Sequence, residues 1–202
     1  MSGIFGMNIK MAIYGESHGK SIGVVLDGLP PGLALDEAAI AAEMARRAPG
    51  QNALSTARKE SDTVEIQSGF FNGFTTGTPL CARIVNSDQH SKDYSILADK
   101  MRPGHADYAG HVRYQGFNDY RGGGHFSGRL TAPLVFAGAV AKQALAQYGI
   151  VVGSHILQIN YIKEERFNPM GVSDEKLAAL HTKKFAVMND AVGEKMQERI
   201  LQ

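Results

Sequence analysis

The chain has 202 residues, 44% hydrophobic and 20% charged, with a formal net charge of +1 at pH 7. This composition is typical of a soluble protein with one hydrophobic core, and it excludes an intrinsically disordered chain. The near-neutral charge, the lack of an apolar run of about 18 residues and the absence of a signal-peptide pattern predict a cytoplasmic protein with no nucleic-acid or membrane partner.

The sequence pattern in the first half of the chain predicts strands and one capped helix. Residues 20–27 (KSIGVVLD) are typical of a buried strand that ends before the Pro30-Pro31-Gly32 turn. Asp36 is the expected cap of a helix that reaches Arg47. Residues 63–69 and 79–85 predict a hairpin with its turn at Thr76-Gly77. The single cysteine, Cys81, excludes an internal disulfide, and its apolar neighbours favour a buried thiol.

The second half predicts a long loop followed mainly by helices. Residues 86–126 are rich in polar residues and glycine, which is typical of a loop that is either functional or poorly ordered. An Ala-rich and Gly-rich helix is expected over 127–148, apolar nearly all round and therefore buried. A strand is expected over 150–160, and two further helices are expected, one capped by Ser173 and one by Asn189 or Asp190. The last helix runs to the end without a stop signal, which predicts a truncated chain.

Two glycine-flanked turns each carry a histidine. His18 lies in GESHG, where flanking glycines let the backbone bring an imidazole close to a ligand. His105 follows a Pro-Gly turn in RPGHAD, and contact with Asp107 would raise its basicity. The alternative interpretation is an ordinary surface turn in both places.

Two arginine-containing segments indicate anion binding. Arg46 and Arg47 end the first helix, in RRAPGQ, and guanidinium groups bind carboxylate and phosphate through two parallel hydrogen bonds. They would equally suit the helix dipole and solvent. The segment DYRGGGHFSGR ends at Arg129, and its triple glycine offers backbone N–H groups to an anion, or else serves as a hinge. It matches neither a dinucleotide-binding nor a P-loop fingerprint. No H-x-x-x-H or C-x-x-C pair is present, so no metal site is expected.

Taken together and in this order, these motifs resemble chorismate synthase over residues 4–160. The shared motifs are GESHG, DGLPPG, RRAPGQ with ARKESD, TTGTP, RPGHAD and DYRGGG. The resemblance implies an α+β fold, a sandwich of mixed or antiparallel sheets around buried helices. We expect one domain over residues 1–202, the N-terminal part of that fold, and a homotetramer at full length.

The resemblance also implies an activity. Members of the family eliminate phosphate from 5-enolpyruvylshikimate 3-phosphate to give chorismate, the last common step towards the aromatic amino acids. They require reduced FMN, which some members reduce with NADPH. Because the C–H bond that breaks is not activated by a carbonyl, the flavin supplies the difficult chemistry while the protein orients and protonates. The alternative hypothesis is a fragment that binds phosphate or flavin, or that assembles, without turnover.

Roles follow by motif. His18 is the expected acid for the departing phosphate, and His105 the residue that protonates or stabilises the reduced flavin near N1. Arg46, Arg47 and Arg129 are the expected contacts of substrate or a nicotinamide nucleotide phosphate, and His125, Phe126 and Ser127 occupy the flavin-contacting position. This chain reads RGGGHFSGRL where the family commonly reads RGGGRSSARE, so contacts of His125, Phe126 and Leu130 differ from those usual in the family. A further arginine that the family often has after the Pro-Gly turn is absent, and Ala53 stands near that place. Members of the family usually run past 300 residues, and their later part supplies more flavin contacts and a catalytic aspartate. We therefore expect no turnover by this chain alone.

Overall fold

A computed structural model describes residues 4–50, 61–87 and 99–202. Backbone contacts divide the described part into two compact units, the first ending at Gln143 and the second comprising Ala144–Gln202. The first unit contains all the residues predicted to act chemically. The expectation of one domain over residues 1–202 stays a prediction.

The first unit is built on a five-stranded sheet in which every pair of neighbours is antiparallel. Its order is β1 (Ile4–Phe5), β2 (Lys10–Gly15), β3 (Ser21–Asp27), β7 (Leu80–Val85) and β4 (Val64–Ser68). The strand expected over 20–27 is confirmed as β3. The sequence analysis missed β2. Its residues, KMAIYG, are half-buried or exposed, because the strand has no fully buried face, and its sequence shows no clear apolar alternation.

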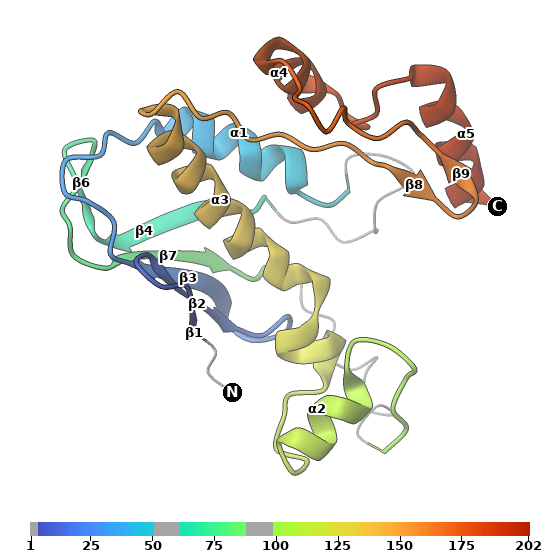
Figure 1. Cartoon of the computed structure of the whole chain (residues 1–202). Helices are drawn as coiled ribbons and strands as arrows, with labels where there is room; N and C mark the ends of the chain where they lie inside the picture. Colours follow the sequence, from blue (N-terminus) through green and yellow to red (C-terminus); the bar gives the residue numbers. More distant parts are fainter. Residues whose placement is uncertain (1–3, 51–60, 88–98) are drawn as a thin grey trace. The chain divides into compact units, whose positions relative to one another are not determined.

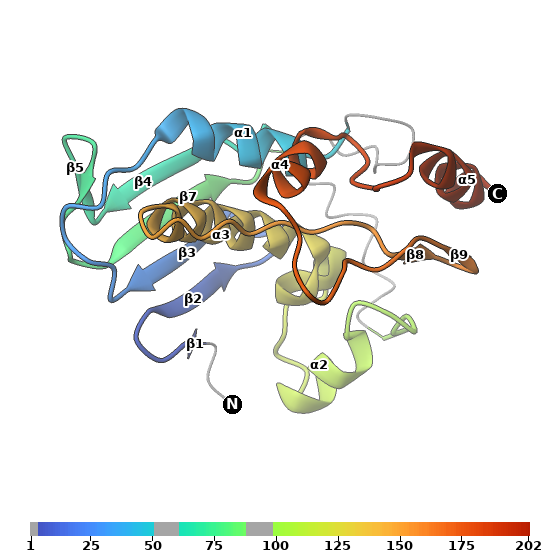
Figure 2. The same cartoon turned by 45° about the horizontal axis from the view of Figure 1, so that its top comes forward.

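Two helices cover one face of this sheet (Figures 1 and 2). Alternate residues of the central strands point to that face and are buried: Ile22, Val24 and Leu26 from β3, and Leu80, Ala82 and Ile84 from β7. The first helix is α1 (Glu37–Arg47), whose N–H groups are capped by Asp36 as predicted. The second is α3 (Thr131–Ala146), which buries Phe136 and Val140 completely. The α+β prediction with buried helices is confirmed.

The connection from β4 to β7 differs from the expected simple hairpin. The two strands do pair antiparallel, but a smaller hairpin of β5 (Phe70–Phe71) and β6 (Phe74–Thr75) lies between them. Its turn is Asn72-Gly73, and both residues have positive φ, as tight hairpins require. The predicted turn at Thr76-Gly77 was therefore wrong. Cys81 was also expected to be buried, but it is half-buried because its side chain lies on the sheet face opposite the core, beside the Tyr14 hydroxyl.

Part of the predicted loop is helical. Within 99–126, α2 spans Asp107–Arg113 and a 3₁₀ segment spans Arg121–Phe126, while residues 88–98 lie outside the described part. The helix expected over 127–148 is observed as a 3₁₀ turn, Gly128–Leu130, followed by α3. Ser127 caps this turn by accepting a hydrogen bond from the Arg129 N–H at 3.2 Å.

The second unit contains little strand. Within the predicted strand 150–160 only β8 (Gln158–Ile159) forms, paired with β9 (Ile162–Lys163), so most of that prediction was wrong. The preceding apolar residues have no ladder partner, and the Ile156 N–H donates instead to the Ala186 carbonyl at 2.7 Å. The two helices α4 (Asp174–Thr182) and α5 (Asp190–Leu201) are capped by Ser173 and Asn189, as predicted.

Candidate functional site

The GESHG turn joins β2 to β3 and buries its central residues. Gly15 ends β2 with φ of +91°, a backbone that favours glycine. The following Ser17 and His18 are 2% and 6% exposed. The Ser17 N–H donates to the Gly124 carbonyl at 3.0 Å, which ties this turn directly to the triple glycine 107 residues further along the chain.

The triple glycine brings the two predicted histidines to neighbouring positions. Gly122, Gly123 and Gly124 all have positive φ. A β-carbon on Gly122 would lie 2.3 Å from the His18 ring, and one on Gly123 would lie 2.9 Å from the His105 ring. Both imidazoles therefore lie against consecutive glycines, whose Cα atoms are about 3.8 Å apart across a trans peptide. Their chemical roles stay predictions.

An arginine fixes the turn that carries His105. His105 and Ala106 both have φ near +50° and are exposed. The expected partner of His105, Asp107, is bound instead by Arg102, through its backbone N–H at 3.0 Å and its guanidinium at 2.9 and 3.2 Å. These hydrogen bonds from Arg102 hold the pKa of Asp107 below its ordinary value. The hydrogen bonds of Asp107 therefore come from Arg102, and His105 acts on this carboxylate through its charge.

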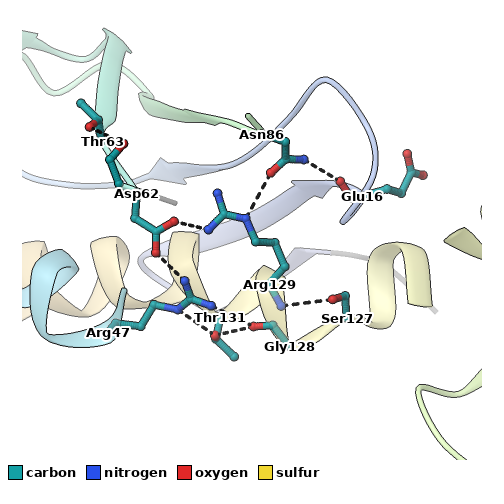
Figure 3. A network of polar contacts seen from close by, with 10 residues as sticks. Glu16, Arg47, Asp62, Thr63, Asn86, Ser127, Gly128, Arg129 and Thr131 are labelled. Atoms are coloured by element: carbon teal, nitrogen blue, oxygen red, sulfur yellow. Dashed lines mark hydrogen bonds and ion pairs between the residues drawn. The ribbon is translucent and has the colours of Figure 1, made fainter. Parts of the chain in front are cut away.

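Arg47 and Arg129 meet at one buried carboxylate (Figure 3). The two oxygens of Asp62 each bind a different guanidinium, Oδ2 that of Arg47 and Oδ1 that of Arg129. Arg129 also donates from Nε to the Asn86 side chain at 3.1 Å. Arg47 comes from the end of α1 and Arg129 from the turn before α3, so the packing of these two helices brings the arginines together.

Asn86 links this arginine pair to the GESHG turn. Its amide nitrogen donates to the carbonyl oxygens of Glu16 and Gly19, at 3.0 and 2.8 Å, while its oxygen accepts from Arg129. Asn86 is 6% exposed, so these bonds replace contact with water. This amide side chain therefore joins the loop carrying His18 to Arg129, which shares Asp62 with Arg47.

Arg46 lies apart from this cluster. Its side chain is 45% exposed, and its guanidinium faces Glu43 one helical turn earlier, at 3.4 Å. Surface pairs of this kind contribute little to stability. For Arg46 the solvent-facing alternative fits the structure, whereas Arg47 joins the site.

The predicted flavin-contacting residues lie beside the same turn. His125 Nδ1 is 2.8 Å from the Gly15 carbonyl. The Phe126 ring packs against Gly110 of α2, and its centroid is 6.2 Å from that of Tyr114. Asp119, clamped by Arg121 at 2.8 and 2.7 Å, has its pKa lowered chiefly by those hydrogen bonds.

His125 and Phe126, but not Ser127, border a cavity of about 470 Å³. It is lined by Ile13, Glu16, Tyr114, Phe117, Asn118, Asp119, His125 and Phe126. Aromatic walls and this volume suit a planar ring system, so the residues present fit the ring of a flavin. The charged groups in the lining, Glu16 and Asp119, are acidic and do not suit the phosphate of such a cofactor.

Sequence reasoning missed Asp62 and Asn86 as site residues. Asp62 stands in the ARKESD motif, but most of that motif, together with Gln51 and Ala53, falls within residues 51–60, which lie outside the described part. Asn86 stands in no motif. Among the described residues, no cluster of three or more histidine, cysteine, aspartate or glutamate side chains is suited to a metal ion, and no helix is long and apolar enough to cross a membrane.

The fold and the site define an α+β protein in which two imidazoles lie against a triple glycine and two guanidinium groups share one buried carboxylate. Comparison with known proteins gives the family. The model of the chorismate synthase family matches residues 9–202, and the chain belongs to that family.

Individual relatives agree with this assignment. Chorismate synthase from Cytophaga hutchinsonii is 48% identical over 163 residues, which cover 81% of this chain and 45% of the relative. The enzyme from Sulfurimonas denitrificans is 47% identical over 188 residues, covering 93% and 52%. A crystal structure of chorismate synthase matches with a TM-score of 0.68 and 27% identity, over 96% of this chain and 52% of that one. The chain thus spans about half the length of the relatives it matches.

Proposed function

We propose that this chain forms the phosphate-handling part of a chorismate synthase. The reaction is the anti elimination of phosphate from 5-enolpyruvylshikimate 3-phosphate. A ring C–H bond and the C–O bond to phosphate break, a C=C bond forms, and no net oxidation occurs. Family membership supports the lyase class, and the residues at the site support the handling of the leaving group.

In this proposal the leaving phosphate meets a proton donor and two cations. His18 donates a proton to the departing oxygen, and Arg47 and Arg129 neutralise the charge that develops on it. A positioned acid and preorganised guanidinium groups lower the barrier most in a site that excludes water. The burial of His18 and Arg129, at 6% and 4% exposed, supports such a site.

Reduced FMN, when bound, would supply the electron-rich ring that this unactivated elimination requires. His125, Phe126 and Ser127 would hold the flavin ring, and His105 would stabilise its N1 edge. The aromatic cavity beside Phe126 supports this placement. NADPH serves as reductant in some members of the family.

One observation carries the proposal: Asn86 joins the loop of His18 to Arg129, which shares Asp62 with Arg47. The loop that carries the proposed proton donor and the arginines that would bind phosphate therefore belong to one hydrogen-bonded unit.

The test is an anaerobic assay of phosphate release from the enolpyruvyl substrate with reduced FMN, on this chain and on a full-length relative with the same motifs. Replacing the counterpart of His18 or of His105 by alanine should lower release by a factor of about 10² to 10⁴. His111→Ala removes an exposed imidazole on α2 and is the control. Unchanged release in the first two variants would contradict the assigned roles.

A second candidate function rests on the coverage of relatives. The chain spans about half their length, and the second candidate is a module that binds phosphate or flavin, or assembles with itself, without turnover. Flavin titration of the 202-residue chain separates the two functions: binding without phosphate release favours the fragment, and release favours the lyase.

We further infer a cytoplasmic, homotetrameric full-length enzyme that acts on a small molecule. The family resemblance supports this inference. Light scattering after size-exclusion chromatography measures the assembly, and a monomeric full-length enzyme would contradict it.

A further inference from the structure

A carboxylate inside the proposed phosphate site has no role in the reaction as described above. The side chain of Asp62 is fully buried, at 0% exposure, and each of its oxygens binds a different arginine (Figure 3). A buried carboxylate is costly unless it is paired and hydrogen-bonded. Its complete burial between two arginines indicates that it is part of the site.

The backbone at this position is also unusual. Asp62 has φ of +50°, in the left-handed region that few residues other than glycine, asparagine and aspartate adopt readily. Unusual backbone conformations are kept where surrounding structure demands them, and they gather at functional sites. The chain accepts this conformation where it places a carboxylate between α1 and the turn before α3.

Asp62 allows the two guanidinium groups to approach each other. Arg47 and Arg129 carry two positive charges, and side-by-side cations repel each other. With one carboxylate between them, the net charge of the cluster is +1, and each arginine gains a charge-assisted hydrogen bond. The Arg129 side chain is 3% exposed, so it relies on Asp62 and Asn86 far more than on water.

The second edge of Arg47 is only loosely held. Its Nε and Nη2 atoms contact the Thr131 hydroxyl and the Gly128 carbonyl at 3.3 and 3.4 Å, both long for hydrogen bonds. An arriving phosphate oxygen would exchange these weak contacts for charge-assisted ones while Nη1 stays on Asp62. Since the Arg47 side chain is 19% exposed, that edge is accessible to a ligand.

We propose that Asp62 is a positioning residue that holds Arg47 and Arg129 ready for a phosphate group. The inference rests on the proposed function, which it deepens. Charge alone argues the other way, because a carboxylate repels phosphate and its removal would raise the charge of the cluster from +1 to +2. Removing Asp62 lowers phosphate affinity if the loss from misplaced guanidinium groups exceeds the gain from removing the repulsion.

The experiment compares the binding of inorganic phosphate to the wild-type chain and to Asp62→Asn by isothermal titration calorimetry. Asparagine also tolerates left-handed backbone, so the substitution removes the charge and keeps the turn. We expect affinity to fall about tenfold to a hundredfold, the effect of losing one charge-assisted hydrogen bond between a misplaced guanidinium and the phosphate. Unchanged or tighter binding would overturn the proposal and show that charge dominates.

Glu65→Gln is the matched control. Glu65 also pairs with an arginine, Arg83 at 2.9 Å, but both side chains are about 45% exposed. The control makes the same chemical change three residues away and outside the site. It should leave phosphate affinity within about twofold of wild type, because exposed pairs contribute little.

If Asp62→Asn does not fold, Asp62→Glu replaces it. This variant keeps the charge and shifts the carboxylate by one methylene. Lower phosphate affinity then supports positioning, and wild-type affinity overturns it. A wild-type chain that binds no phosphate contradicts the proposed function and this inference with it, whereas phosphate binding that is indifferent to Asp62 contradicts the inference alone.

Discussion

The rings of His18 and His105 lie against two consecutive glycines, Gly122 and Gly123. The histidines come from turns 87 residues apart, so neither turn alone determines that they are neighbours. Because both glycines have positive φ and neither has room for a β-carbon, the triple glycine serves as a contact surface for imidazoles. The alternative interpretation of this segment as a hinge does not account for these contacts.

Gly123→Ala tests this contact. The new methyl group would lie 2.9 Å from the His105 ring, whereas Gly73 has nearly the same φ, +85° against +83°, and open space around it. Gly73→Ala therefore carries the same backbone cost without the collision. We expect Gly123→Ala to lose about 1 kcal/mol of unfolding free energy beyond Gly73→Ala, the low end of the cost of overpacking, because the exposed His105 side chain can shift. Urea denaturation measures the difference, and equal losses would contradict the contact.

Adjacent arginines on α1 should differ in function. Arg47 binds Asp62 at the site, whereas Arg46 faces solvent and Glu43. Arg47→Ala should weaken the binding of inorganic phosphate about tenfold or more, because bonds from a charged donor contribute about 1.5–3 kcal/mol. Arg46→Ala should leave the dissociation constant within about twofold. The reverse order, measured by calorimetry, would mean that the substrate contact was assigned to the wrong residue.

Glu164 makes the second unit sensitive to acid. Burial alone raises the pKa of this carboxyl, but N–H groups of Met188 and Asn189 and the ring of His155 bind it, and the net effect is a lowered pKa. A carboxyl with a lowered folded-state pKa stabilises the fold above its ordinary pKa of 4.5. That stabilisation is lost as the pH falls from 4.5 through the lower folded-state value.

Glu164→Gln should therefore reduce stability at neutral pH by about 1–3 kcal/mol, the cost of unmaking buried hydrogen bonds. It should also flatten the acid limb of the stability profile. Glu165→Gln, at the exposed neighbouring position, is the control and should do neither. Chemical denaturation between pH 3 and 7 provides the measurement; an acid limb of wild-type steepness in Glu164→Gln would show that another group causes it.

Local features of the fold were predictable from the sequence, and distant contacts were not. The caps Asp36, Ser173 and Asn189 act within three residues, so their helices were placed correctly. The strand expected over 150–160 was mostly wrong because a strand also needs a partner, which apolar patterning does not specify.

The site shows the same division. Glycine-flanked histidines and paired arginines mark the motifs, but Asp62 reaches Arg129 across 67 residues and Asn86 reaches it across 43. No periodicity encodes such contacts. The sequence alone does not distinguish Arg46 from Arg47. The orientation of α1 on the sheet places Arg47 at Asp62 and leaves Arg46 at the surface.

The central claim is that His18 and the pair Arg47 and Arg129 face one phosphate group. The most direct measurement is a titration of the ¹⁵N-histidine-labelled chain with inorganic phosphate, followed by NMR through the imidazole nitrogens. We predict that the His18 signals shift with the phosphate dissociation constant and that His155 signals in the second unit do not move. In Arg47→Ala the His18 shift should require phosphate concentrations about tenfold higher or more. Phosphate binding that leaves the His18 signals unchanged would contradict the account.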